Sequence, residues 1–68
     1  MIKFAERLLQ LRKEANLKQI ELASILSTTQ RRISHLESGK IEPDLATLVA
    51  IAKHFKVTLD YLVGITDY

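Results

Sequence analysis

Residues 22–37 read LASILSTTQRRISHLE, and the spacing of their apolar side chains decides the fold. Two short amphipathic runs flank a polar turn at residues 27–29. The apolar residues that would hold the two runs together are Leu22, Leu26, Ile33 and Leu36. The small residue Ala23 lies four positions before Ser27, where a larger side chain would push two crossing helices apart. The stretch therefore predicts one helix over residues 19–26 and a second, capped by Thr29, that ends at Glu37.

The segment before this pair predicts a longer helix over residues 2–15, because its apolar side chains recur at intervals of three and four. The expected inward residues are Phe4, Leu8, Leu11 and Ala15. The expected polar register holds Glu6, Arg7, Arg12 and Lys13. Asn16 is a candidate left-handed stop for this helix.

The segment after the pair predicts two more helices. Gly39 and Pro43 bracket a loop, and Asp44 is placed to cap a fourth helix. Its expected inward residues are Leu45, Leu48, Ile51, Ala52 and Phe55. Thr58 caps a short fifth helix that ends at Gly64. No segment alternates with a period of two, so we expect an all-α fold of five helices in one domain, residues 1–68.

Composition narrows the possible functions. The 68 residues are 47% hydrophobic and contain no cysteine, which favours a small globular domain in a reducing cytoplasm. The longest apolar run, residues 48–52, is far too short for a membrane span, and no signal peptide pattern follows Met1. The two histidines are isolated and only two glycines are present. We therefore expect no enzyme, metal, cofactor or small-molecule substrate.

The positions of the charged residues along the chain are more informative than the net charge. A net charge of +2 is weak evidence for a polyanionic partner. The middle of the chain carries Lys18, Arg31, Arg32 and Lys40, whereas the last third carries Glu42, Asp44, Asp60 and Asp67. One face of the molecule is therefore expected to be basic.

The two crossing helices have the helix-turn-helix spacing, in which the second helix projects its first exposed side chains into a DNA major groove. On residues 30–37 those side chains are Gln30, Arg31, Ser34 and His35. A glutamine can bind the N6 and N7 atoms of adenine, and an arginine the O6 and N7 atoms of guanine. For His35 a plain surface position remains equally open. Arg32 faces away from the expected groove side and is assigned to the DNA backbone or to solvent.

Three stretches together resemble a known family: LLQLRKEANLKQIELA, LSTTQRRISHLESGK and PDLATLVAIAKHFKVTLDYLVG. They are similar to the XRE/Cro/CI-type helix-turn-helix regulators of bacteria and phages, which include the lambdoid phage repressors and Cro proteins. The resemblance implies a five-helix domain that binds double-stranded DNA, usually as a homodimer on a palindromic operator, to regulate and most often repress transcription. Three features depart from the pattern: Ser27 replaces the usual turn glycine, Lys18 replaces the usual serine cap, and Leu9 and Ile25 stand where polar residues are common.

The residues themselves predict the phosphate contacts: Gln19 stands at the positive end of its helix, Thr29 can donate its hydroxyl, and Lys18 and Lys40 supply charge. Plain solvation is the alternative for Gln19 and for the two lysines. The resemblance also implies roles for individual residues. Gln19 would also brace the helix of residues 30–37 by contacting Gln30. Arg12 and Glu37 match a structural ion pair, with Arg12 free to share its guanidinium with a phosphate.

Two questions remain open at the level of sequence. The apolar side chains of Tyr61, Val63, Ile65 and Tyr68 form either a two-fold dimer patch or a satellite cluster against the fourth helix. The alternative to a DNA-binding regulator is a protein-interaction module, such as the antitoxin of a toxin pair. Exposure of Leu9 and Ile25 would favour this alternative. A regulator of the first kind would lie in the bacterial cytoplasm, associated with the nucleoid when bound to DNA.

Overall fold

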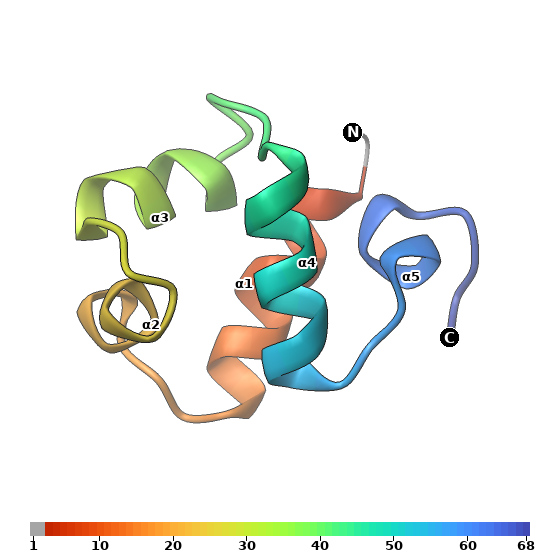
Figure 1. Cartoon of the computed structure of the whole chain (residues 1–68), viewed down its shortest axis with the longest axis horizontal. Helices are drawn as coiled ribbons and strands as arrows, with labels where there is room; N and C mark the ends of the chain where they lie inside the picture. Colours follow the sequence, from red (N-terminus) through yellow and green to blue (C-terminus); the bar gives the residue numbers. More distant parts are fainter. Residues whose placement is uncertain (1–2) are drawn as a thin grey trace.

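The computed structural model describes residues 3–68, and within them five helices follow one another without a strand. The helices are α1 (Phe4–Glu14), α2 (Gln19–Ile25), α3 (Gln30–Glu37), α4 (Leu45–Phe55) and α5 (Leu59–Val63). Figure 1 shows α1 and α4 in the middle of the molecule, with α2 and α3 on one side and α5 on the other. Helix α1 packs on α3 and α5, α2 packs on α3, and α4 packs on α5. The predicted all-α fold class is confirmed.

Three helices begin at the caps that the sequence predicts. The side-chain oxygens of Thr29, Asp44 and Thr58 accept hydrogen bonds from the third backbone N–H of α3, α4 and α5, at 3.1, 2.8 and 3.0 Å. Helix α2 begins differently, because the Lys18 side chain has no acceptor atom. The carboxylate of Glu21 reaches back instead and accepts from the Lys18 backbone N–H at 2.7 Å. One half of a capping box therefore replaces the missing serine cap.

All five described helices end at a residue in the left-handed conformation. These residues are Asn16, Ser27, Gly39, Lys56 and Gly64, with φ between 56° and 88°. At the turn after α2, the Thr28 N–H donates to the Ala23 carbonyl at 2.9 Å and the Ser27 N–H donates to the Ser24 carbonyl at 3.2 Å. This is the Schellman pattern, which satisfies the last carbonyls of a helix. A side chain at such a position costs about 1 kcal/mol, so Ser27 retains a strained turn where glycine would be relaxed.

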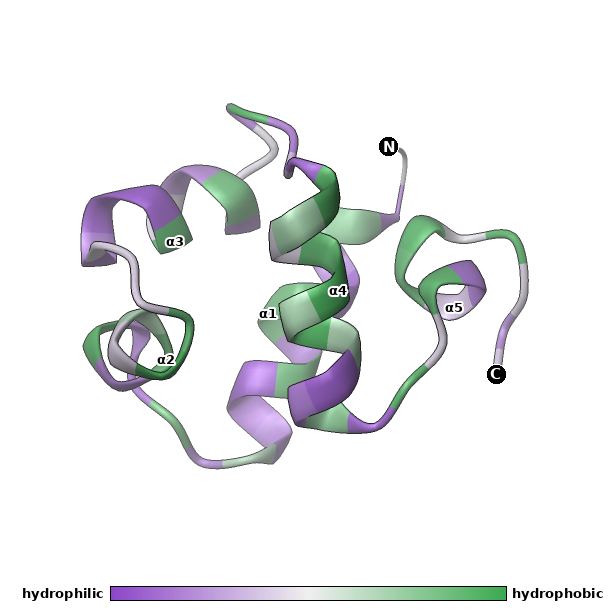
Figure 2. Cartoon of the chain, in the orientation of Figure 1, coloured by the Kyte–Doolittle hydropathy of each residue, from purple (hydrophilic) through white to green (hydrophobic). Residues whose placement is uncertain are grey.

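Residues from all five helices form one core: Phe4, Leu8, Leu22, Ala23, Ile33, Leu36, Leu48, Ile51 and Leu62. Figure 2 shows the hydrophobic residues of α4 along much of its length and polar residues along much of α3. Two expectations are wrong. Leu45 is 69% exposed, because it opens α4 beyond the edge of the core, where Pro43 is buried instead. Ala15 is also exposed, at the end of α1. Helix α1 begins at Phe4, and the predicted start at Ile2 lies outside the described residues.

Arg7 is the largest departure from the expected pattern. The polar register expected for it is wrong, because Arg7 is only 8% exposed. Its position three after Phe4 and four before Leu11 places it on the edge of the apolar stripe. Its Nη1 atom donates to the carbonyls of Tyr61 and Thr66, the latter at 2.5 Å. Arg7 therefore holds the segment after α5 against α1.

No described helix is long and apolar enough to cross a membrane. No group of three histidine, aspartate or glutamate side chains in this part of the chain is placed to hold a metal ion.

Candidate nucleic-acid interface

The turn between α2 and α3 fixes how α3 is presented. Ala23 is 2% exposed, and its carbonyl accepts a hydrogen bond from the turn, so the backbone of the turn lies close to this small residue. On α3, Ile33 and Leu36 are fully buried in the core. Because these two residues fix the inward face of α3, the opposite face of the helix is turned outward.

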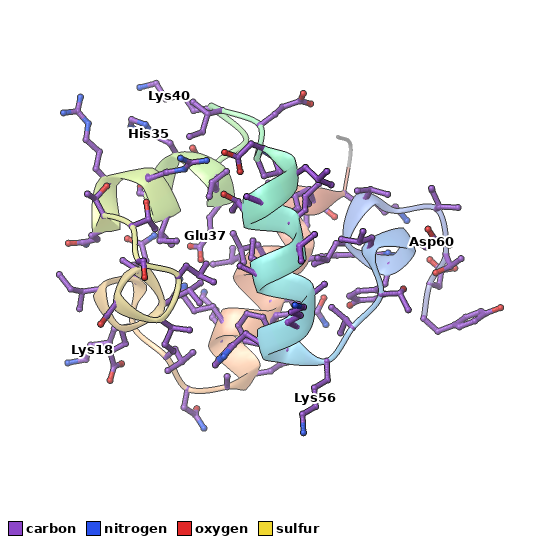
Figure 3. The ribbon with its side chains drawn as sticks, in the orientation of Figure 1. Lys18, His35, Glu37, Lys40, Lys56 and Asp60 are labelled. Atoms are coloured by element: carbon purple, nitrogen blue, oxygen red, sulfur yellow. The ribbon has the colours of Figure 1, made fainter. Side chains whose placement is uncertain are left out.

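The residues predicted to contact bases lie on that outward face. Gln30 and Arg31 are exposed in the first turn of α3, and Ser34 and His35 are half-buried one turn further on. Figure 3 shows His35 directed away from the molecule, on the same side as Lys40. The structure thus brings all four side chains onto one short helix, with Gln30 and Arg31 exposed at its N-terminal end.

A series of hydrogen bonds links α1 to the C-terminal end of α3, then to the start of α2, and finally to the first turn of α3. Arg12 donates to Glu37 through Nε at 2.6 Å and through Nη2 at 3.1 Å, and its Nη1 donates to the Leu17 carbonyl at 2.8 Å. Gln19 Nε2 donates to Glu37 Oε1 at 3.0 Å. Gln30 Nε2 donates to Gln19 Oε1 at 3.4 Å, which is the expected brace.

The central ion pair is well sheltered, with side-chain exposures of 12% for Arg12 and 5% for Glu37. A paired and hydrogen-bonded group of this kind fixes geometry, since removing either partner leaves a buried charge without its counterion. All three nitrogens of the Arg12 guanidinium are engaged within the chain. This arrangement holds α1, α2 and α3 in one relative position and leaves Arg12 little capacity for a phosphate.

The residues predicted to contact phosphate surround the outward face of α3. Lys18, Thr29 and Lys40 are exposed and Gln19 is half-buried. Figure 3 places Lys40 beyond the C-terminal end of α3 and Lys18 on the far side of α2. The Thr29 hydroxyl already accepts the cap hydrogen bond from the Arg32 N–H, which leaves its own proton free to be donated. Lys40 thus lies near α3, whereas Lys18 lies on the side of α2 that is away from α3.

Arg32 has a role within the chain that the sequence did not predict. Its Nη2 atom lies 3.3 Å from the Thr47 hydroxyl and 3.8 Å from an Asp44 carboxylate oxygen, at the start of α4. The hydroxyl and backbone N–H of Thr47, with a smaller contribution from Arg32, hold the pKa of Asp44 below its usual value. Arg32 therefore links the N-terminal ends of α3 and α4, and no motif would have indicated this contact.

The residues of the possible dimer patch divide into two groups. Tyr61 and Val63 are half-buried, with the Tyr61 ring 4.2 Å from the Arg7 guanidinium and Val63 packed on the core. Ile65 and Tyr68 are exposed, Tyr68 by 91%. Tyr61 and Val63 therefore fit the alternative of a cluster packed within the domain. Of the four residues, only Ile65 and Tyr68 offer a large exposed apolar surface.

Comparison with known proteins gives consistent results. The profile of a helix-turn-helix family matches residues 8–62. The chain is 44% identical over 63 residues to the HTH-type transcriptional activator BcrR of Enterococcus faecalis, covering 93% of this chain and 31% of that protein. It is 34% identical over 68 residues to the HTH-type transcriptional regulator DdrOP3 of Deinococcus deserti, covering 98% of this chain and 53% of that protein. The chain thus spans about a third to about half of the length of these two relatives.

Two solved structures share the arrangement of the helices. The P22 c2 repressor in complex with a synthetic operator superposes with a TM-score of 0.82 and 29% identity, covering 87% of this chain and 89% of that one. A transcriptional regulator from Listeria innocua superposes with a TM-score of 0.85 and 38% identity, covering 90% of this chain and 57% of that one. The chain therefore belongs to the helix-turn-helix family of DNA-binding transcriptional regulators, as its resemblance to the lambdoid phage repressors and Cro proteins predicts.

Proposed function

We propose that this protein binds a palindromic DNA operator as a homodimer and represses transcription, with α3 inserted into the major groove. The observation that carries the proposal is the first turn of α3, where Gln30 and Arg31 are exposed while Ile33 and Leu36 anchor the helix in the core. Long hydrogen-bonding side chains on a rigid, accessible helix are what direct reading of base edges requires. The likeness to the P22 c2 repressor bound to an operator supports the same mode of docking.

The base contacts are divided along α3. Gln30 reads an adenine through N6 and N7, and Arg31 reads a guanine through O6 and N7. Ser34 and His35 lie one turn further along the same face and contact the neighbouring bases or the adjoining backbone. Each bidentate contact is worth about 1–3 kcal/mol of discrimination against a wrong base.

The phosphate contacts position α3 without reading sequence. Lys18 and Lys40 supply mobile positive charge, and the Thr29 hydroxyl and the second amide proton of Gln19 donate to phosphate oxygens. Because each neutralised phosphate releases counterions, binding should weaken steeply as salt is added. The DNA would thus be held by four groups that surround the four base-reading side chains.

The size of the domain supports binding as a dimer. Its longest extent is 28 Å, which is shorter than the roughly 34 Å between successive major grooves on one face of DNA. One copy therefore cannot occupy both halves of a palindrome. We place the two-fold contact at the C-terminal end, where Ile65 and Tyr68 are exposed.

The test is selection of bound sequences from a random duplex library with the purified chain. An enriched inverted repeat with a half-site spacing of about one helical turn supports the proposal. Enrichment of a single, unrepeated site would remove the dimer and the palindrome while keeping specific binding. A folded protein that enriches no sequence would overturn the assignment of α3 as a base-reading helix.

A second candidate function is docking on a protein partner, as an antitoxin docks on its toxin. Exposed apolar side chains on α2 favour it: Ile25 is 43% exposed, and Ile20 is more so. Leu9, the other position expected to signal this function, is half-buried. Copurification of a stoichiometric partner that Ile25→Glu abolishes, with DNA binding retained, would establish this second function beside the first.

A further inference from the structure

We propose that the cavity between the α2–α3 turn and the first half of α4 binds a short-chain carboxylate, with Arg32 as its cationic partner. The cavity has a volume of about 180 Å³, and it is lined by Leu26, Ser27, Thr28, Arg32, Ala46, Thr47 and Ala50. The inference is independent of the proposed function, which assigns no contact to these residues.

A hydrogen-bond donor on Arg32 carries the inference. Within residues 3–68, the Arg32 Nε atom is buried and has no hydrogen-bond partner. The other contacts of this guanidinium are long, since Nη2 lies 3.3 Å from the Thr47 hydroxyl and 3.8 Å from an Asp44 carboxylate oxygen. A buried donor without an acceptor is costly, above all when it is charged. An oxyanion in the cavity that Arg32 lines supplies a charged acceptor.

The other walls of the cavity define the rest of the ligand. Besides Arg32, three lining residues carry a hydroxyl group and three are apolar. The hydroxyl groups can donate to the oxygens of an anion, whereas the apolar side chains favour a hydrocarbon portion. Apolar walls with a few polar groups that fix the orientation are typical of small-molecule sites. The chemistry of the walls therefore fits a carboxylate with an aliphatic chain better than an inorganic anion.

The volume limits the length of that chain. Sites for drug-sized ligands have volumes of roughly 300–1,000 Å³, so a cavity of about 180 Å³ is too small for a nucleotide. One water molecule takes roughly 30 Å³ in the liquid, so the cavity has room for about six molecules of this size or for about as many heavy atoms. Butyrate, with about six heavy atoms by the same count, fits this space.

Asp44 provides a test of the charge that the site prefers. Its carboxylate is 63% exposed and lies 3.8 Å from Arg32 Nη2, so it opposes a second anion beside the same guanidinium. Asp44→Asn removes this negative charge and still caps α4, because asparagine caps a helix as well as aspartate does. If the cavity takes an anion, this variant binds it more tightly, by about two- to fivefold for a partly exposed charge.

The experiment is titration of sodium butyrate into the purified chain at constant ionic strength, followed by the backbone amide shifts in NMR spectra. We expect saturable shifts at Thr28 and Thr47 with a Kd of about 1–10 mM, as befits a ligand of so few atoms. Arg32→Gln should raise this Kd about tenfold or more, because the hydrogen bonds to the charged group are lost. Ala50→Leu, which fills part of the cavity, should also raise it. The control is Lys53→Gln, which removes an exposed positive charge from the last turn of α4 and should leave the Kd unchanged.

The outcomes that overturn the proposal are distinct. A wild-type chain without saturable shifts has no such site. Acetate or inorganic phosphate that binds as tightly as butyrate would show that the apolar walls select nothing. An unchanged Kd in a folded Arg32→Gln variant would remove Arg32 as the partner of the anion. Because Asp44→Asn and Ala50→Leu should shift the Kd in opposite directions, the test holds even if Arg32→Gln does not fold.

Discussion

The buried side chain of Arg7 leads to the sharpest prediction about stability. Arg7→Met should destabilise the domain strongly, although the apolar part of the side chain is kept. The Arg7 side chain is 10% exposed. Its guanidinium donates to the carbonyls of Tyr61 and Thr66 and to the Asp67 carboxylate, and it lies over the Tyr61 ring. Methionine removes every one of these contacts and leaves the Thr66 carbonyl without its Arg7 donor, whereas the Tyr61 carbonyl keeps the hydrogen bond from the Gly64 N–H at 3.1 Å.

The magnitude follows from the environment of each contact. Two hydrogen bonds from a charged donor and one cation–π contact together stabilise the fold by several kcal/mol. Methionine also removes the cost of burying the Arg7 charge, which offsets part of this, so we expect the free energy of unfolding to fall by about 2–3 kcal/mol. Asp67 is 89% exposed, so the ion pair itself contributes less than about 1 kcal/mol. A domain of this length has a total stability of roughly 3–10 kcal/mol, so the loss is a large share. It corresponds to a decrease in Tm of roughly 10–20 °C.

The assay is thermal and urea denaturation of the wild type, Arg7→Met, Asp67→Asn and Arg31→Met. Arg31→Met makes the same chemical change at an exposed position and should alter the free energy of unfolding by no more than about 0.5 kcal/mol. Hydrogen exchange provides a local readout, because the Ile65 N–H, bonded to the Asp60 carbonyl at 2.9 Å, should lose protection in Arg7→Met. Equal melting temperatures for Arg7→Met and Arg31→Met would refute the assignment of Arg7 as the residue that holds the C-terminal segment.

Three further predictions concern the turn, the cap of α4 and the DNA. Ser27→Gly should raise the free energy of unfolding by about 0.5–1 kcal/mol in urea denaturation, because a left-handed serine is replaced by the residue that adopts φ of 56° freely. The hydrogen bonds that lower the pKa of Asp44 stabilise the fold above about pH 4, the ordinary value for aspartate, and this stability is lost as pH falls through the lower folded value. Asp44→Asn should therefore flatten the dependence of Tm on pH below about pH 4. Arg31→Ala should relax one base position of the selected operator, whereas Lys40→Ala should weaken all duplexes alike and reduce the salt slope by about one. Equal losses on every duplex for Arg31→Ala would show that it contacts only phosphate.

The helix starts could be predicted because their signals are local. A threonine or aspartate followed by a helical run caps the helix with its own side chain, and Thr29, Asp44 and Thr58 all do so. The helix ends were predicted less completely. Gly64 and Asn16 are residue types that favour the left-handed conformation, but Lys56 adopts it without any such signal. There the packing of the helices on either side imposes a conformation that lysine alone disfavours.

The long-range contacts mark the limit of prediction from periodicity. Arg7 stands at a spacing that fits the buried stripe, yet its charge placed it on the surface in our expectation. Its partners lie 54 and 59 residues further along the chain and are backbone carbonyls. Because every residue has a backbone carbonyl, the sequence does not indicate these partners. Arg32 reaches α4 for a similar reason, since its partners are a cap residue and a hydroxyl that many loops contain. Spacing can show that a position faces inward, but it does not show which polar groups the side chain will contact there.

The same limit applies to specificity, with one instructive difference. The exposed positions of Gln30 and Arg31 follow from the helical repeat of α3 alone, so the candidates for base contact could be named from the sequence. Which base a glutamine reads depends on the orientation of its amide, and that orientation is set by neighbours on other helices. Glu37 and Arg12 meet across 25 residues, and the Glu37 carboxylate also accepts a hydrogen bond from Gln19. Gln30 in turn contacts Gln19 on α2, so the sequence of α3 alone does not fix how the Gln30 side chain is held.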